Sequence, residues 1–363
     1  MPAPAPARLG ANQKRKGAVH PVRAFAIASL VPVGLIGAGA VWGGVWIWAA
    51  LIYMTLFAFF MDQIIAQAAP PADPTRELPS ADALSAVLAV SHFALLALVI
   101  RALATGGQGV AGWIAFYVAA SLFFGQISNS NAHELIHRRD RRLFNLGKWV
   151  YISLLFGHHT SAHNKVHHRF AASDDDPNTA RPGESFYRFA PRAWVGSFVK
   201  GYQMEQADIA RRGRGGLNPY RVYVGGGLAA LGLSGLAFGW AGAGVHLLLA
   251  FYAQTQLLLS DYVQHYGLRR ARRPDGKLEP IGPAHSWNAR HWFTSHMMLN
   301  APRHSDHHAH PARPYPQLEL HPRAVAPILP SSLPAMATLA LFPGPWRRVM
   351  GRALKRWNGG VTA

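Results

Sequence analysis

The 363-residue chain is too apolar for an ordinary soluble domain, because half of its residues are hydrophobic and only 15% are charged. Its net charge of +19 would suit nucleic-acid binding, but the basic clusters flank apolar runs, as the positive-inside pattern of membrane proteins requires. Cysteine is absent, which excludes disulfides, thiolate-ligated zinc and iron–sulfur centres within this polypeptide. The composition therefore predicts an integral membrane protein without a nucleic-acid partner.

The chain is predicted to contain one membrane domain, at residues 23–350, between a disordered basic tail at 1–22 and a C-terminal tail at 351–363. Six apolar runs lack an internal Lys, Arg, Asp or Glu, and each approaches the ~20 residues that cross a bilayer. These runs are residues 24–41, 45–61, 84–100, 110–127, 222–240 and 245–260. We therefore predict an all-α integral membrane protein with six transmembrane helices.

The basic clusters predict the orientation of these helices. Lys14–Lys16, Arg138–Arg142, Arg211–Arg214 and Arg269–Arg273 all fall on one side of the predicted bundle, and the short connections on the other side are almost uncharged. The positive-inside rule places the basic side in the cytoplasm. We expect a multi-pass protein of a bacterial-type inner membrane, with both termini and a histidine-rich cap in the cytoplasm.

Two apolar segments outside the six runs are not predicted to cross the membrane. Residues 145–156 are too short, so they are predicted to be interfacial or re-entrant, and the proline-broken stretch 329–342 is predicted to contact the membrane surface. The glycine-rich sequences GLIGAGAVWGG and VGGGLAALG lie within or beside membrane runs, where small residues favour close helix packing. No bound nucleotide, flavin or haem is expected.

Nine histidines in four clusters carry the strongest chemical signal. Their spacings place the members of each cluster on one face of a helix or helical turn, and imidazole binds first-row transition metals well. The clusters are HELIH (His133, His137), HNKVHH (His163, His167, His168), DYVQHYGL (His265) and HSDHH (His304, His307, His308). Eight or nine imidazoles exceed what one metal uses, so two metal ions are predicted.

The individual clusters leave alternatives open. HELIH alone matches the zinc-protease pattern, with Glu134 as the water-activating base, but such a protease needs only one further ligand. In a redox centre Glu134 would be a supporting carboxylate, and Asp176 and Asp306 would hydrogen-bond the second nitrogen of a ligand. His265 is isolated in the sequence, and a single histidine at a helix end more often has a structural role than a metal-binding one. The other ten histidines of the chain are not predicted to be ligands.

The motifs together are similar to those of a known family. HELIH, HNKVHH with its following DDP segment, DYVQHYGL and APRHSDHHAHP resemble the integral-membrane alkane hydroxylases (alkane 1-monooxygenases) of the membrane fatty acid desaturase/hydroxylase superfamily. The likeness spans residues from about 40 to 350. It implies a six-helix bundle, a cytoplasmic cap and a non-haem centre of two iron ions, and it implies that His265 is the ninth ligand.

Three positions depart from the family pattern. Ala162 and Val166 stand in the second cluster where Glu and Gly are usual, and Gln264 replaces a usual Glu before His265. All nine imidazoles are kept, so metal binding is expected to survive. The departures put the tuning of the metals and the choice of substrate in doubt.

The resemblance implies a monooxygenase that hydroxylates a terminal C–H bond of medium-chain alkanes or similar apolar hydrocarbons. It would use O2 and electrons from rubredoxin or ferredoxin with an NAD(P)H-dependent reductase, and its apolar substrate would enter from the bilayer. Phe57, Phe59 and Phe60 are predicted to limit substrate length.

Other functions remain open at this stage. Close alternatives are hydroxylation of alkyl-aromatic methyl groups, as in xylene monooxygenase relatives, and fatty-acyl desaturation. An intramembrane zinc metalloprotease is an alternative of a different class. A metal transporter is disfavoured, because only His92 and His246 lie within predicted spans.

Overall fold

The computed structural model describes residues 22–65, 69–73, 77–213 and 215–360, so the predicted tail at 1–22 falls almost entirely outside it. Within these ranges the regular secondary structure is helical, and loops join the helices. The β-structure described there amounts to two isolated bridges, Arg272–Leu278 and Asn288–Ile328. The prediction of an all-α protein is therefore confirmed.

Five helical stretches in the described ranges are long and apolar enough to span a membrane, with mean hydropathy between 1.5 and 2.4. Short π-helical turns, η1 (Tyr53–Phe57) and η2 (Phe123–Ser128), interrupt the second and fourth stretches without ending them. The stretches are α1 (Arg23–Trp42), α2–η1–α3 (Val45–Ile52, Tyr53–Phe57, Ala58–Ile64), α4 (Pro79–Thr105), α5–η2–α6 (Gly109–Leu122, Phe123–Ser128, Asn129–Leu135) and α11 (Tyr220–Gln264). The protein is thus a multi-pass membrane protein.

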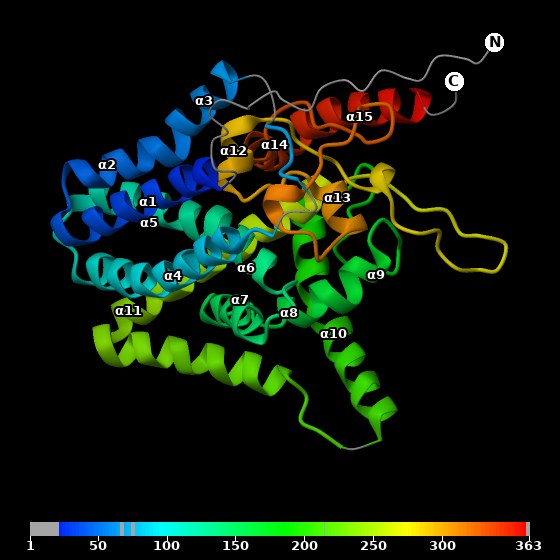
Figure 1. Cartoon of the computed structure of the whole chain (residues 1–363). Coiled ribbons are helices and arrows are strands. Elements are labelled where there is room, and N and C mark those ends of the chain that lie inside the picture. The colour runs from blue at the N-terminus through cyan, green and yellow to red at the C-terminus, as the bar shows by residue number, and fades with distance from the viewer. Residues whose placement is uncertain (1–21, 66–68, 74–76, 214, 361–363) are drawn as a thin grey trace, which may run out of the picture.

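The last stretch accounts for the difference between five candidate spans and the predicted six. α11 has 45 residues, about 68 Å if straight, which is twice the thickness of a hydrocarbon core. It bends at Phe238 and Gly239, and Gly239 has φ +67°, a conformation that only glycine adopts without strain. The two predicted runs, 222–240 and 245–260, are therefore the two limbs of one bent helix, seen folding back on itself in Figure 1.

The helices that are not candidate spans follow the fourth span and the bent helix, and they build most of the histidine-bearing side of the molecule. The Asp140 side chain accepts hydrogen bonds from the backbone N–H groups of Arg142 (2.7 Å) and Leu143 (3.1 Å) and so caps α7, which with 13 residues is too short to cross a bilayer. α15 includes ten residues of the predicted C-terminal tail. These helices are α7 (Arg141–Ser153), α8 (His159–Ala162), η3 (His163–His167), α9 (His168–Phe170), α10 (Phe186–Arg212), η4 (Pro283–His285), α12 (Trp292–Met297), α13 (His304–Ala309), η5 (Tyr315–Gln317), α14 (Leu333–Ala340) and α15 (Pro343–Gly360).

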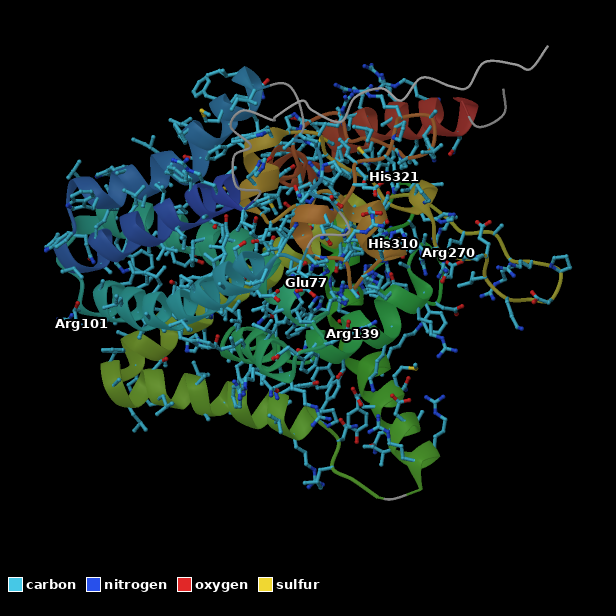
Figure 2. All side chains as sticks on the ribbon, in the orientation of Figure 1. Glu77, Arg101, Arg139, Arg270, His310 and His321 are labelled. Atoms are coloured by element: carbon cyan, nitrogen blue, oxygen red, sulfur yellow. The ribbon has the colours of Figure 1, made fainter. Side chains whose placement is uncertain are left out.

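The candidate spans lie side by side, and most of the other helices gather at one end of them, whereas α7 lies against α4 and α11 (Figure 1). α1 packs against α2 and α4, and α4 packs against α11. Figure 2 shows Arg101 at one end of this bundle and Arg139, Arg270, His310 and His321 at the other. The histidine-rich and basic end is thus separate from the end that carries Arg101.

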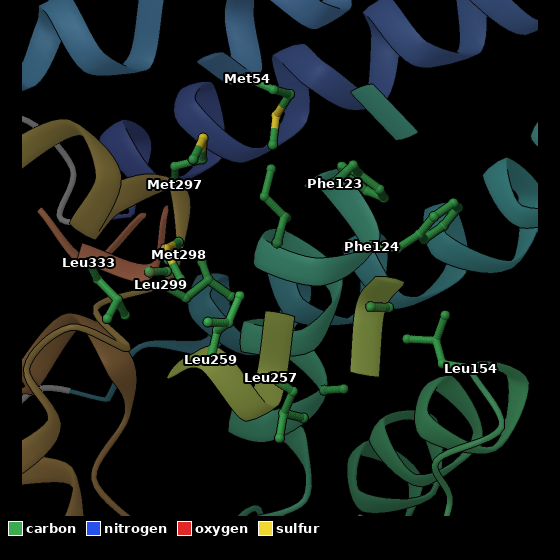
Figure 3. Packing of buried hydrophobic residues seen from close by; sticks show 14 of the residues in the cluster. Met54, Phe123, Phe124, Leu154, Leu257, Leu259, Met297, Met298, Leu299 and Leu333 are labelled. Carbon is green, nitrogen blue, oxygen red and sulfur yellow. The ribbon is translucent and has the colours of Figure 1, made fainter. Parts of the chain in front are cut away.

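A buried apolar cluster joins the membrane helices to the shorter ones. Figure 3 shows Met54 from η1 and Phe123 from η2 near Leu259 of α11 and Met297 of α12, and all four are buried. Because side chains of distant segments close-pack here, the ends of the fourth span and of α11 are held in fixed positions. Those two helix ends carry His133 and His265.

Candidate metal centre

The nine predicted ligands come from helix ends that converge at the basic side of the bundle. His133 lies in the last turn of α6, with His137 just after it, and His265 directly follows α11. The second cluster occupies η3 and the start of α9, and the fourth cluster occupies α13. Sequence distance is therefore no guide to proximity here, because His133 and His307 have ring centroids only 4.3 Å apart.

The nine imidazoles form two groups, within each of which one nitrogen of every ring lies within 4.8 Å of the others. In the first group, Nε2 of His163 lies 2.8 Å from Nε2 of His133 and 2.9 Å from Nε2 of His168. Nε2 of His307 lies 3.1 Å from Nε2 of His168. The first group comprises His133, His137, His163, His168 and His307.

The second group lies beside the first and is more deeply buried. Nε2 of His304 lies 3.0 Å from Nε2 of His265 and 3.1 Å from Nε2 of His308. The groups adjoin, since the rings of His168 and His308 have centroids 4.6 Å apart. The second group comprises His167, His265, His304 and His308, all of them buried.

These contacts suit cations better than hydrogen bonds. Nε2 of His163 faces two other Nε2 atoms, but a neutral imidazole nitrogen offers one proton or one lone pair, so it cannot satisfy both. A cation about 2.0–2.1 Å from each nitrogen, at angles of about 90° to 109°, would hold neighbouring nitrogens roughly 2.8–3.4 Å apart. The buried Nε2 atoms of His137 and His167 also lack a partner among the described residues. The donor set therefore fits two first-row transition metals.

Burial keeps most of these rings neutral, which metal binding requires. Removal from water, together with neighbouring imidazoles, holds the pKa values of His163, His304 and His308 well below the usual value. Protons therefore do not compete for these nitrogens near pH 7. Burial would also lower the pKa of His167, but the charge and the hydrogen bond of Asp176 outweigh it and raise that pKa.

Asp176 is the predicted carboxylate that contacts a candidate ligand. Its Oδ2 lies 2.9 Å from Nδ1 of His167 and also accepts a hydrogen bond from the Thr179 hydroxyl at 2.7 Å. The arrangement leaves Nε2 of His167 as the free nitrogen and fixes the direction of the ring.

The other two predicted carboxylates have different partners among the described residues. Glu134 pairs with Arg138 at 2.7 Å and accepts a hydrogen bond from the backbone N–H of Tyr315. Asp306 pairs with Arg313 at 2.7 Å and contacts His310 at 3.0 Å. Both carboxylates tie the segment that follows α13 to its surroundings, and neither makes a described hydrogen bond to one of the nine imidazoles.

The predicted length-limiting phenylalanines point outward. Phe57, Phe59 and Phe60 have 41%, 47% and 56% of their surface exposed, respectively. Phe57 packs on Phe293, and Phe59 lines an outer cavity, described below. None of the three lines the chamber beneath the histidines.

Two cavities lead toward the histidines. An inner chamber of about 60 Å³ is bordered by His133, His163 and His304. An outer cavity of about 380 Å³ is bordered by apolar residues that include Met54, Leu122 and Leu341. The two have common wall residues, namely Gln126, Gln256, Pro334 and Ala337. The inner chamber, which the imidazoles border, and the outer, mostly apolar cavity therefore adjoin at these four residues.

The polar wall of the inner chamber was missed by sequence reasoning. Gln126, Asn129 and Ser130 from the fourth span face Gln256 and Ser260 from α11 across this space. A usable signal existed, because uncharged polar residues interrupt runs that are otherwise apolar.

Comparison with known proteins identifies the family. The model of the fatty acid desaturase family matches residues 108–340, a segment that contains all nine histidines. The chain belongs to the fatty acid desaturase family. Within that family it is an alkane 1-monooxygenase-like oxidoreductase, as the next comparisons show.

Curated relatives agree with this placement. The chain is 33% identical to alkane 1-monooxygenase 2 of Pseudomonas aeruginosa, over 69% of this chain and 66% of the relative. It is 31% identical to alkane 1-monooxygenase 2 of Alcanivorax borkumensis, over 70% of this chain and 67% of the relative. It is also 27% identical to the xylene/toluene monooxygenase hydroxylase component of Pseudomonas putida, over 62% of this chain and 60% of the relative. The chain thus spans about two thirds of the first two relatives.

Proposed function

We propose that this chain is a membrane-bound, non-haem diiron monooxygenase that hydroxylates an unactivated C–H bond of an apolar substrate. The observation that carries the proposal is the pair of adjoining all-imidazole groups, each with its ring nitrogens within 4.8 Å of one another. The nine residues of these groups are the proposed iron ligands. Two irons held there would supply O2 activation and oxygen insertion, with one oxygen atom entering the product and the other leaving as water.

The protein's own residues would place and protect this chemistry. Asp176 orients His167 through the 2.9 Å contact, and the buried rings of the second group need no rearrangement to present their nitrogens. Leu257, Met298 and Leu333 line the inner chamber and limit the entry of bulk water. The outer cavity, bordered by membrane helices, would admit the substrate from the bilayer.

The two electrons per turnover must come from another protein, because a chain without cysteine holds no iron–sulfur centre. We propose rubredoxin or ferredoxin, reduced by an NAD(P)H-dependent reductase, as the donor. The basic end of the bundle, with Arg139 and Arg270, would attract such an acidic partner. The same basic end and both chain termini would lie on the cytoplasmic side of a bacterial-type inner membrane.

Product analysis under 18O2 tests the proposal directly. Cells that express the chain with an electron donor would be fed octane, p-xylene and an acyl lipid, and the products identified by mass spectrometry. Hydroxylation with one 18O atom per product supports the monooxygenase, whereas a new double bond without label supports a desaturase. Hydrolysis that is independent of O2, by a protein that retains zinc, would support the metalloprotease instead.

The xylene-type activity is a second candidate because of the 27% identity with the xylene/toluene monooxygenase hydroxylase component. In the same feeding experiment it predicts a labelled benzylic alcohol from p-xylene and little alcohol from octane.

A further inference from the structure

The long helix α10, at the histidine-bearing end of the bundle, is not among the candidate spans. It comprises Phe186–Arg212, and charged residues such as Arg192, Lys200 and Asp208 recur along it. In Figure 1 it runs across the direction of the membrane helices, and it packs against α8 and η3. The inner side of α10 therefore supports the second histidine cluster, which begins in η3.

The outer side of α10 carries an exposed stripe of apolar and aromatic side chains. Their positions are four or seven residues from one another along the helix, so they share one face. Each has between 38% and 60% of its surface exposed. An exposed apolar patch of this kind indicates a surface that contacts another molecule. The apolar stripe consists of Tyr187, Trp194, Val195, Phe198, Val199 and Tyr202.

The apolar stripe adjoins the membrane helix α11. Nε1 of Trp194 donates a hydrogen bond to Oε1 of Gln254, in the second limb of that helix, at 3.0 Å. The ring centroids of Phe198 and Tyr202 lie 5.0 Å and 5.4 Å from the ring centroid of Tyr220, the first residue of α11. The stripe therefore lies at the level where the first limb of α11 begins.

The other end of the stripe adjoins a second segment that is predicted to contact the membrane. The hydroxyl of Tyr187 donates to the carbonyl oxygen of Leu341 at 2.9 Å. The next residue, Phe342, is 58% exposed and ends the stretch 329–342, which the sequence predicts to lie on the membrane surface. Tryptophan and tyrosine suit the bilayer interface, because each ring combines an apolar body with one polar group.

Exposed arginines border the apolar stripe. Arg188 lies near one end of the stripe, and Arg212 and Arg221 follow its other end. None of the three forms an ion pair with an acidic residue that the structure describes. Lipid phosphates would supply this counter-charge, whereas a second copy of the chain would bring like charges to the same face. A bilayer interface therefore suits both the stripe and the arginines.

The inner side of α10 holds the segment that carries Asp176. Nη1 of Arg192 donates to the carbonyl oxygen of Pro177 at 2.7 Å, and Nζ of Lys200 donates to the carbonyl oxygen of Asp175. Both chain neighbours of Asp176 are thus bonded to α10, and Asp176 itself contacts a ring of the second metal group. The position of α10 therefore affects the orientation of that ring.

We propose that α10 lies in the bilayer interface on the histidine-bearing side, with its apolar stripe at the boundary of the acyl chains and its neighbouring arginines at the lipid phosphates. The bilayer then supports the second metal group through α10 and the segment that carries Asp176. This role goes beyond the proposed reaction and does not depend on it.

Spin labels test the position of α10, and a chain without cysteine accepts one label at a time. Val195→Cys places a label on the apolar stripe, and Ala207→Cys places one on an exposed side about a third of a turn away. The full-length protein would be studied in nanodiscs of phosphatidylcholine and phosphatidylglycerol. We expect the label at 195 to lie roughly 5–10 Å below the headgroups and to meet O2 more than a water-soluble nickel chelate. The label at 207 should show the reverse.

Two results would overturn the proposed position. One is a label at 195 that the nickel chelate reaches as readily as the label at 207, since the stripe would then face water. The other is a label at 195 that is shielded from both reagents and broadened by the label of another molecule, because a second copy of the chain would then cover the stripe.

Metal affinity tests the connection to the second group. The double variant Val195→Asp, Val199→Asp introduces charge into the apolar stripe, and we expect the weaker of the two metals to bind roughly tenfold less tightly. The double variant Gln203→Asp, Ala207→Asp introduces the same charge at other exposed positions of α10 and should bind metal as the wild type does. Competition between a chelator and the protein for Fe(II), in nanodiscs, measures both.

The outcomes are separate from the reaction proposed above. Equal metal affinity in the two double variants would overturn the support of the second group by α10. Absence of O2-dependent hydroxylation would reject the monooxygenase, but it would change neither the label accessibility nor the metal affinity.

Discussion

The Nε2 atoms of His133 and His163 lie 2.8 Å apart, although 30 positions separate the two residues in the chain. The lone pairs of the two imidazole nitrogens point toward each other, and a cation bound between them accounts best for this arrangement. The whole account of the protein follows from this arrangement and from its repetition in the second group, where His265 and His304 are 3.0 Å apart.

Replacing one imidazole of a group should release the metal that this group holds, so each single variant should lose about one metal per chain. We expect His137→Ala and His265→Ala each to lower the iron content from about two to about one per chain and to abolish hydroxylation, since each group would lose a ligand. Elemental analysis of the purified proteins measures this. His310→Ala is the control. His310 directly follows α13, which carries three of the nine imidazoles, but it belongs to neither group. Unchanged iron in His265→Ala would remove His265 from the ligand set.

Asp176 should affect metal affinity through His167 without binding metal itself. Asp176→Asn loses the charge that orients His167 at 2.9 Å, and we expect metal affinity to fall roughly 10- to 100-fold. Competition with a chelator of known affinity measures the change. Asp174→Asn removes a nearby carboxylate that pairs with Arg269 on the surface, and it should have little effect. Equal losses in both variants would contradict a specific role for Asp176.

Stability should fall as the pH falls, because buried histidines outside the metal groups resist protonation. Burial lowers the pKa of His158 to about 3 and that of His296 to about 4, from about 6.5 in the unfolded chain. Below about pH 6.5 the unfolded chain therefore binds protons that the folded protein does not, which favours unfolding. The stabilisation is present above pH 6.5 and is lost as the pH falls toward 4.

Melting temperatures of the metal-free protein between pH 7.5 and pH 5 measure this effect. We expect a decrease toward pH 5 that is smaller in His158→Gln and in His296→Gln than in the wild type. A melting temperature that rises toward pH 5 would contradict the assigned direction of these shifts.

Asp62 should stabilise the junction between the second span and α12. Its Oδ1 accepts hydrogen bonds from the backbone N–H groups of Phe293 (2.9 Å) and Thr294 (3.1 Å), at the N-terminus of a helix more than 200 positions away. Asp62→Ala leaves both donors unpaired, and we expect it to cost about 1–2 kcal/mol. Thermal melting in detergent reports the loss. Gln63→Ala, at an exposed neighbouring position, should be neutral, and an equally stable Asp62→Ala would contradict the capping role.

The sequence predicts the helices and the convergence of the histidine clusters because both depend on local pattern. Apolar runs of membrane length determine the spans, and short histidine spacings place ligands on one helical face. The connection predicted between the runs 222–240 and 245–260 lies instead at Phe238 and Gly239, because Gly239 adopts a positive φ that a hydropathy pattern does not locate. Residues 241–244 are therefore helical, although a connection between two spans is expected there.

The rest of the site depends on which faces of distant helices meet. Gln126 and Gln256 look incidental in their own segments, and only the packing of η2 on α11 places both at the inner chamber. Phe57 and Phe60 are predicted to limit substrate length, but both are partly exposed and neither borders the outer cavity or the inner chamber. Hydropathy does not show which face of such a helix points toward the site, because both faces of these helices are apolar.

Iron stoichiometry tests the central claim most directly. The full-length protein would be purified without metal, reconstituted anaerobically with Fe(II) and analysed for iron per chain, with His137→Ala and His265→Ala beside it. Two irons per wild-type chain and about one in each variant are predicted. Well under one iron per wild-type chain after reconstitution would contradict a diiron centre built from these nine imidazoles.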